Sequence, residues 1–78
     1  MSTSPLTADR VRADVAELLQ VPAQSIADDD NLFDLGLDSV RVMTLIQRWR
    51  DAGAAELEFP DLAEQPELAH WQRLVVGG

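Results

Sequence analysis

The sequence predicts an all-α protein, a small four-helix bundle of three longer helices and one short helix. Apolar side chains recur at the spacing of an amphipathic helix in three separate segments. Strand signals are nearly absent, because the chain has neither alternating runs of β-branched residues nor an Asn-Gly or Asp-Gly hairpin turn. With 78 residues, of which 46% are apolar, the chain is long enough for one folded domain around a single small core.

The first predicted helix begins near Thr7 and Asp9, two residue types that favour helix starts, and ends near Gln20. Pro22 sets that end, because a proline disfavours helical conformation in the residue before it. The helix carries apolar side chains at i, i+4, i+7 and i+8, which places them on one face. These are Val11, Val15, Leu18 and Leu19.

The second predicted helix covers residues 39–52, and Gly53 is typical of the position that follows a helix. A third longer helix follows Pro66, a residue suited to the first turn. Between these two helices, residues 57–64 are expected to form one or two helical turns. The core-facing stripes of the two longer helices are Val42, Leu45, Ile46 and Trp49, and Leu68, Trp71, Leu74 and Val75.

The connection over residues 21–38 is long for a small bundle, and loops of this length are usually functional or packed against the core. Its apolar side chains are expected to anchor it by burial. These are Ile26, Leu32, Phe33, Leu35 and Leu37. The whole chain, residues 1–78, is expected to be one domain, with residues 1–5 and 77–78 as loose ends.

The charge balance of the chain excludes several classes of partner. Six basic residues against 14 acidic ones give a formal net charge of −8, and such a surface repels nucleic acid and anionic lipid. Basic patches on other proteins are the better match. The chain has no cysteine, so it has neither a disulfide nor a thiolate metal site. No segment resembles a secretory signal or a membrane span, and we expect a cytoplasmic monomer.

Ser39 stands at the start of the second predicted helix, shortly after Gly36 and Asp38. Asp38 is placed to accept hydrogen bonds from the first free amides of the helix, an interaction typically worth about 1 kcal/mol. Gly36 allows a sharp approach of the backbone. The serine hydroxyl is then exposed beside the positive end of the helix, which favours an anion. The position is therefore suited to hold a phosphate ester on Ser39.

Val40 and Met43 share the face of Ser39 and lie well outside the core-facing stripe of the second helix. One interpretation is a surface that binds other proteins, since methionine adapts to varied partners. The other interpretation is that residues 57–64 cover both side chains as ordinary core. The residues alone leave the two interpretations open for Met43 and favour exposure slightly for Val40.

The sequence lacks residues that two other kinds of site, a hydrolase nucleophile elbow and a calcium loop, require. A hydrolase nucleophile elbow requires Gly-x-Ser-x-Gly, but Arg41 stands in place of the second glycine, and the one imidazole, His70, lies on the last helix. A calcium loop that starts at Asp28 requires an oxygen ligand at the position of Leu32 and a glycine at that of Phe33. We therefore expect neither hydrolase activity nor a metal site.

Residues 31–43, "NLFDLGLDSVRVM", contain the run Leu-Gly-Leu-Asp-Ser-Val, which resembles the phosphopantetheine attachment motif of carrier proteins. The resemblance extends from the first helix through "EFPDLAEQPELAHWQRL", nearly the whole chain. It implies that Ser39 bears a 4′-phosphopantetheine arm, transferred covalently from coenzyme A, with Asp38 and Gly36 as parts of the motif. It also implies a non-catalytic carrier, whose only thiol is that of the arm.

The second helix indicates the kind of carrier. Residues 39–50 contain no acid and three arginines, Arg41, Arg48 and Arg50, whereas fatty-acid carriers typically have an acidic second helix. The sequence is instead similar to the aryl carrier domains of nonribosomal peptide synthesis, such as siderophore assembly. That similarity implies three partners: a phosphopantetheinyl transferase, a stand-alone adenylation enzyme that loads an aromatic or amino acid, and a condensation domain that receives it. The alternatives are an acyl carrier for polyketide or fatty-acid chemistry and an unmodified acidic helical adaptor.

The resemblance also implies a partner surface on the second helix and on the short helix that follows it. Carried onto this sequence, the surface consists of Met43, Phe59 and Ala63, with Val40 beside the serine. The alternative for Phe59 is a place in the core, which is common for a large aromatic side chain in a small protein. Glu67 stands where many carriers have threonine, a departure that lies outside the attachment motif.

Overall fold

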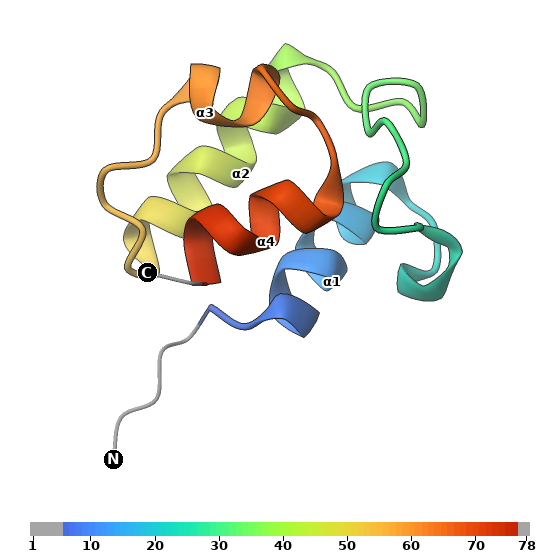
Figure 1. Ribbon diagram of the computed structural model, residues 1–78, viewed down its shortest axis with the longest axis horizontal. Helices are drawn as coiled ribbons and strands as arrows, with labels where there is room; N and C mark the ends of the chain where they lie inside the picture. Colours follow the sequence, from blue (N-terminus) through green and yellow to red (C-terminus); the bar gives the residue numbers. More distant parts are fainter. Residues whose placement is uncertain (1–5, 77–78) are drawn as a thin grey trace.

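Four α-helices and one short 3-10 helix make up the described part of the molecule, residues 6–76 of a computed structural model (Figure 1). In chain order they are α1 (Ala8–Leu19), η1 (Ala23–Ser25), α2 (Ser39–Asp51), α3 (Phe59–Ala63) and α4 (Leu68–Val76). The predicted all-α bundle of three longer helices and one short helix is therefore confirmed. The expected loose ends, residues 1–5 and 77–78, lie outside the described residues.

Neither a sheet nor a membrane-spanning helix is found in the described part of the chain. Its β-pairing is limited to an isolated bridge between Asn31 and Glu67. No helix among these residues is long and apolar enough to cross a bilayer.

The helix ends follow from local sequence. Thr7 caps α1, since its Oγ1 accepts a hydrogen bond from the backbone amide of Arg10 at 3.0 Å. The same helix stops at Gln20, which adopts the left-handed conformation with φ 60°. The short helix α3 begins with a capping box, in which Asp61 accepts a hydrogen bond from the amide of Glu58 at 3.0 Å.

α1 packs against both α2 and α4, and α3 packs against α2. The connection between α1 and α2 lies at one end of the bundle, on the right of Figure 1. It is tied to the segment before α4 by a hydrogen bond of 2.8 Å from the amide of Leu32 to the carbonyl of Pro66. At the beginning of α1, the carbonyl of Ala8 accepts a hydrogen bond from the side chain of Gln72 in α4 at 2.9 Å.

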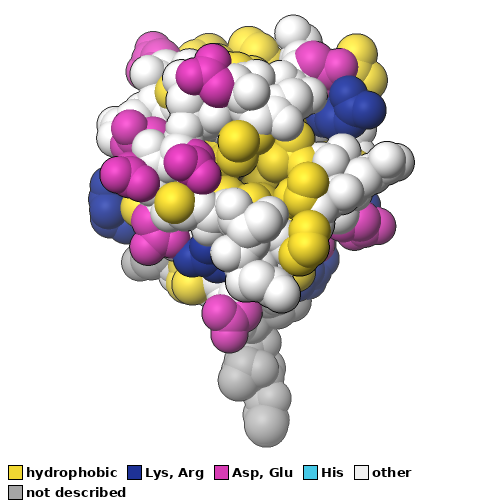
Figure 2. Space-filling model, turned by 90° about the vertical axis from the view of Figure 1, so that its right-hand side faces the viewer, with side chains coloured by type: hydrophobic (Ala, Val, Ile, Leu, Met, Phe, Trp, Pro, Cys, Tyr) yellow, Lys and Arg dark blue, Asp and Glu magenta, His cyan; other side chains and the backbone are white. Residues whose placement is uncertain are grey.

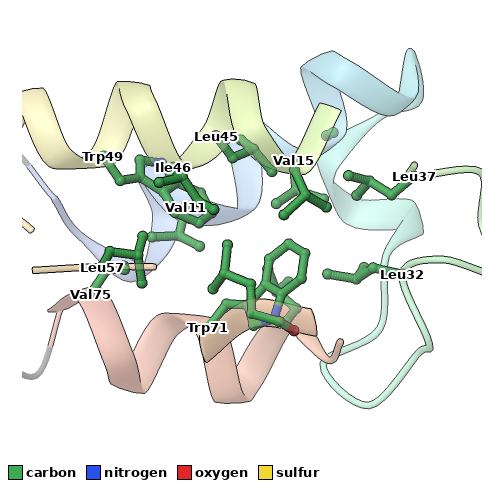
Figure 3. Close-up of a cluster of buried hydrophobic side chains, with 14 of the residues drawn as sticks. Val11, Val15, Leu32, Leu37, Leu45, Ile46, Trp49, Leu57, Trp71 and Val75 are labelled. Atoms are coloured by element: carbon green, nitrogen blue, oxygen red, sulfur yellow. The ribbon is translucent and has the colours of Figure 1, made fainter. Parts of the chain in front are cut away.

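A continuous hydrophobic core joins the four helices and the long connection (Figure 3). At its centre, the rings of Trp49 from α2 and Trp71 from α4 meet edge to face, with centroids 6.2 Å apart and planes inclined at 73°. The indole N–H of Trp71 donates to the carbonyl of Leu62 in α3 at 2.9 Å. The other fully buried side chains are Leu32, Leu45, Leu62, Leu68, Val11, Val15 and Val42.

Three of the five expected anchors of the connection, Ile26, Leu32 and Leu37, are buried. Phe33 is half-buried against the core. The expectation for Leu35 is wrong, since 44% of this residue is exposed. The amides of Leu35 and Leu37 both donate to the carbonyl of Leu32 at 3.2 Å. This tight turn directs Leu32 and Leu37 into the core and leaves Leu35 outside.

Leu74 is a second correction, because it is exposed although the sequence pattern places it in the core stripe of α4. The buried residues of this helix are Leu68, Trp71 and Val75, at i, i+3 and i+7. At about 100° per residue, Leu74 falls roughly 60° beyond Trp71, outside that stripe. The stripe of α4 is therefore narrower than the sequence predicts.

Asp14 of α1 is the one charged residue buried among residues 6–76, with 8% of it exposed. It accepts hydrogen bonds from the indole N–H of Trp49 at 2.8 Å, from Arg48 Nη1 at 3.1 Å and from Arg10 Nε at 3.3 Å. Arg48 also donates to Glu17 at 2.9 Å. The hydrogen bonds to Glu17 and Asp14 outweigh the opposing effect of burial and raise the pKa of Arg48 above its ordinary value. This cluster links α1 to α2, and the sequence pattern does not predict it.

Candidate functional site

Asp38 caps α2, as the sequence predicts. Its backbone is extended, with φ −131° and ψ 178°, and its Oδ1 accepts a hydrogen bond from the amide of Arg41 at 2.9 Å. Its carbonyl accepts the amide of Val42 at 2.9 Å, which starts the helical hydrogen-bond ladder. Ser39 is therefore the first helical residue, and it is exposed.

Gly36 turns the chain into this cap with φ +119°, a conformation that L side chains rarely adopt. Space is not the constraint, because a Cβ built there would lie 3.7 Å from Leu19 Cδ2, an ordinary contact distance. The constraint is the backbone, which must reverse just before the buried Leu37 so that Asp38 reaches the helix start.

Replacing Gly36 by alanine is expected to lower the free energy of unfolding by about 1–3 kcal/mol, because the added Cβ strains a backbone with positive φ. Gly53 is the matched control, since its φ is +132° and nothing lies within 4 Å of a Cβ built there. Urea unfolding should give similar losses for Gly36→Ala and Gly53→Ala. A much larger loss at Gly36 would mean that packing against Leu19, and not the backbone, limits this position.

Two apolar side chains flank the serine on the surface of α2. Val40 is 75% exposed and Met43 is 53% exposed. The structure therefore excludes the interpretation that residues 57–64 cover them as core. In α3, Phe59 and Ala63 are half-buried, and Phe59 packs against the core. Partial burial of Phe59 fits both a place in the core and a place on a partner surface, so its assignment to the partner surface stays a prediction.

Arg41 is a residue of the site whose contacts are not among those predicted from the sequence pattern. Its Nη1 donates to Asp38 Oδ2 at 2.9 Å, and its Nε donates to the carbonyl of Leu18 in α1 at 3.1 Å. The spacing i, i+3 from Asp38 to Arg41 at a helix start is the sequence signal that indicates the first of these contacts. The second joins residues 23 positions apart, and no local pattern predicts it.

The acidic run over residues 28–31 has partners within the fold. Asp28 pairs with Arg12 of α1, and Asp30 Oδ2 accepts the amide of Ala27 at 2.9 Å. Within the described part of the chain, no three His, Asp or Glu side chains gather as a group that could hold a metal ion. These carboxylates therefore stabilise the connection.

Two surface hollows lie away from the serine. One, of about 470 Å³, lies beyond the C-terminal end of α2, and its lining includes Gly53, Leu57, Asp61 and Leu74. Because the 13 residues of α2 rise about 1.5 Å each, this hollow is roughly 20 Å from Ser39. The other, of about 310 Å³, lies between the beginning of α1 and the side of α4.

Figure 2 shows the end of the bundle that carries the connection between α1 and α2. Hydrophobic side chains gather at the centre of this face, and Asp and Glu side chains lie around them. Val21 and Leu35 are the large apolar residues of the connection that are exposed. This end of the molecule thus carries apolar surface among charged side chains, with arginine side chains as well as acidic ones.

One family model matches most of the chain. It is described as a phosphopantetheine attachment site, and it matches residues 9–74, which include every residue of the attachment motif. Acyl carrier protein ScoB of Streptomyces coeruleorubidus is 42% identical over 72 residues, which are 92% of this chain and 84% of that protein.

Two much longer relatives contain a segment similar to this chain. Isochorismatase of Bacillus subtilis is 48% identical over 69 residues, which are 88% of this chain and 22% of that protein. Phenyloxazoline synthase MbtB of Mycolicibacterium paratuberculosis is 42% identical over 78 residues, the whole of this chain and 7% of that protein. The chain thus spans less than a quarter of either relative. No solved structure gives a significant match.

Proposed function

We propose, from the premise that this chain belongs to the phosphopantetheine attachment family, that Ser39 carries the prosthetic arm and presents an acyl group as a thioester. Members of this family are carriers, in general non-catalytic, and their cofactor is 4′-phosphopantetheine. The arm supplies a thiol, which this cysteine-free chain lacks. Gly36 and Asp38 position the serine to which the arm is attached.

The residues around Ser39 suit a phosphodiester. The amides of Ser39 and Val40 have no acceptor within the described chain, because Asp38 takes the amides of Arg41 and Val42 instead. Free amides at the positive end of a helix favour an anion. An exposed serine hydroxyl beside such an open helix start is the observation that carries the proposal.

The proposed cargo is an aromatic acid, held for synthesis of the nonribosomal peptide type. Residues 39–50 carry no acid, unlike the second helix of fatty-acid carriers. The name of one relative, phenyloxazoline synthase, specifies a product with a phenyl ring. The match to acyl carrier protein ScoB supports a second candidate, a carrier of other acyl chains.

The proposed partners are a phosphopantetheinyl transferase, a stand-alone adenylation enzyme and a condensation domain. We place all of them, with this protein as a monomeric single domain, in the cytoplasm, where coenzyme A and ATP are available. Val40 and Met43 form the part of the proposed partner surface on α2, and Phe59 and Ala63 form the part on α3. Exposure of the first two side chains supports this assignment.

The test of the carrier function has two stages. Incubation with coenzyme A, magnesium and a broad-specificity transferase should raise the intact mass by one phosphopantetheine group. Addition of ATP, an aromatic acid and its adenylation enzyme should then add the mass of the aryl group, which hydroxylamine should release as expected for a thioester. No gain in the first stage with folded protein would favour an unmodified adaptor. Loading from fatty-acyl donors alone would favour the second candidate.

Replacing Met43 by aspartate is expected to raise the KM of the adenylation enzyme for the modified protein about tenfold, because a charge would enter an apolar contact. Stability should change little, since Met43 is exposed. Ala55→Asp is the control, because it adds the same charge at an exposed position beyond the other end of α2. Equal effects of the two variants on KM would contradict the partner surface and indicate a general effect of charge.

A further inference from the structure

The proposed site brings two negative charges close together. Asp38 places a carboxylate one residue before Ser39, and attachment of the arm would add a phosphodiester anion. The formal net charge of −8 repels the phosphates of coenzyme A as well. Since like charges a few ångströms apart interact strongly near a protein surface, a compensating cation beside Asp38 would favour the modification.

Arg41 holds both carboxylate oxygens of Asp38. Its backbone amide donates to Oδ1 at 2.9 Å, and its guanidinium Nη1 donates to Oδ2 at 2.9 Å. Both side chains are about half exposed, so this ion pair alone contributes little to the free energy of unfolding. Its effect is local, because it compensates the carboxylate next to Ser39.

The same guanidinium reaches the end of α1. Its Nε donates to the carbonyl of Leu18 at 3.1 Å, one of the last four carbonyls of that helix, which have no partner within the helix. The last turn of α1 contains no basic residue. Arg41 therefore supplies, from α2, the cation that the negative end of α1 favours. One side chain joins the end of α1 to the beginning of α2.

Arg41 is not placed to contact a group on Ser39 directly. Residues at i and i+2 of a helix do not face each other. The two side-chain hydrogen bonds of Arg41 go to Asp38 and to Leu18, which holds the guanidinium on the side of α1. Any influence on the serine must therefore pass through Asp38 and through the orientation of the first turn of α2.

We propose that Arg41 is a positioning residue for the modification of Ser39, an inference that rests on the proposed function. It holds the first turn of α2 against the last turn of α1, which fixes the direction of the serine Oγ, and it compensates the charge of Asp38. In the transfer, the bond from Oγ to the pantetheine phosphorus forms and the pyrophosphate bond of coenzyme A breaks. Adenosine 3′,5′-bisphosphate leaves, and the hydroxyl proton passes to a base of the transferase.

The experiment compares Arg41→Gln and Arg41→Lys with Arg50→Gln in the transfer from coenzyme A. Arg50 is an exposed arginine of the same helix, and its side chain makes no hydrogen bond or ion pair within residues 6–76. Arg50→Gln therefore removes the same positive charge without removing a side-chain contact. We expect Arg41→Gln to lower the kcat of the transferase roughly 10- to 100-fold with KM changed less than about twofold, as for a misplaced nucleophile. Arg41→Lys keeps the positive charge but lacks the planar guanidinium group, so it should give an intermediate kcat. Arg50→Gln should behave like the wild-type protein.

A second measurement needs no transferase. Amide hydrogen exchange at Arg41, whose amide donates to Asp38, should be faster in both Arg41 variants and unchanged in Arg50→Gln. Circular dichroism establishes the folded fraction of each variant, and Arg41→Lys retains the test if Arg41→Gln unfolds.

Three outcomes would overturn the inference. If kcat is unchanged while exchange is faster, Arg41 only stabilises the helix start. If KM rises with kcat unchanged, Arg41 contacts the transferase itself. If the wild-type protein accepts no phosphopantetheine, the proposed function fails, and this inference fails with it.

Discussion

Substitution of Ser39 by alanine is expected to abolish the attachment of phosphopantetheine and to leave the fold intact. The hydroxyl is the only atom of this side chain that can form the ester, so the gain in mass should be lost entirely. The free energy of unfolding should change by less than about 1 kcal/mol, because the residue is exposed and Asp38 already caps the helix. Intact mass spectrometry and thermal denaturation measure the two effects.

Ser25→Ala is the matched control. Ser25 is also exposed, and its hydroxyl donates to the carbonyl of Pro22 at 2.7 Å. This variant should accept the arm as the wild-type protein does. A gain in mass that persisted in Ser39→Ala would place the arm elsewhere. A loss of several kcal/mol in Ser39→Ala would make the serine structural, as the adaptor alternative requires.

Removal of the Asp14 carboxylate is expected to cause the largest loss of stability of any polar substitution in the described chain. Asp14→Ala should lower the free energy of unfolding by about 1–3 kcal/mol, because it leaves the buried indole N–H of Trp49 without its acceptor. Arg48 loses one of its two carboxylate partners and keeps Glu17. A small domain has only a few kcal/mol of net stability, so this loss is a large fraction of the total. Urea unfolding followed by tryptophan fluorescence measures the loss.

Glu17→Gln separates burial from charge in this cluster. Glu17 also receives a hydrogen bond from Arg48, at 2.9 Å, but its side chain is exposed. Its replacement should therefore cost less than about 1 kcal/mol. Similar losses for Asp14→Ala and Glu17→Gln would show that burial of the Asp14 carboxylate is not what makes the cluster important.

Periodicity and helix caps predict most of the fold, because they are local properties. The stripes of α1 and α2, the cap at Asp38 and the end of α1 near Pro22 all follow from residues within one or two turns of each other. The predicted burial is wrong for Leu35 and Leu74. A tight turn exposes Leu35, and the narrow buried stripe of α4 leaves Leu74 at the surface. Apolar spacing alone shows neither effect.

Contacts between distant residues are the part that the sequence does not predict. Asp14 lies 35 residues from Trp49, and no spacing rule pairs an acid on one helix with an indole on another. The arginines of residues 39–50 illustrate the same limit. Arg41 and Arg48 are joined to α1, and only Arg50 is left as a free surface cation among the described residues of α2.

The sequence predicts the class of the site better than it predicts the surface around it. The carrier class follows from the attachment motif, and the family match confirms it. The sequence favours exposure of Val40 only slightly and leaves both interpretations open for Met43, and the structure shows that both side chains are exposed. The assignment of Phe59 and Ala63 to the partner surface stays a prediction, because a half-buried side chain fits both a core and a docking role.

The hydrogen bond from Gln72 to the carbonyl of Ala8 bears on where the domain can be tethered. α1 begins beside α4, and Leu74 of α4 lies beside the C-terminal end of α2, so α1 starts and α4 finishes away from Ser39 (Figure 1). A polypeptide tether joined to the beginning of α1 or to the end of α4 would therefore be attached at the end of the bundle opposite Ser39. Since α2 is roughly 20 Å long, such a tether would leave the surface around Ser39 uncovered.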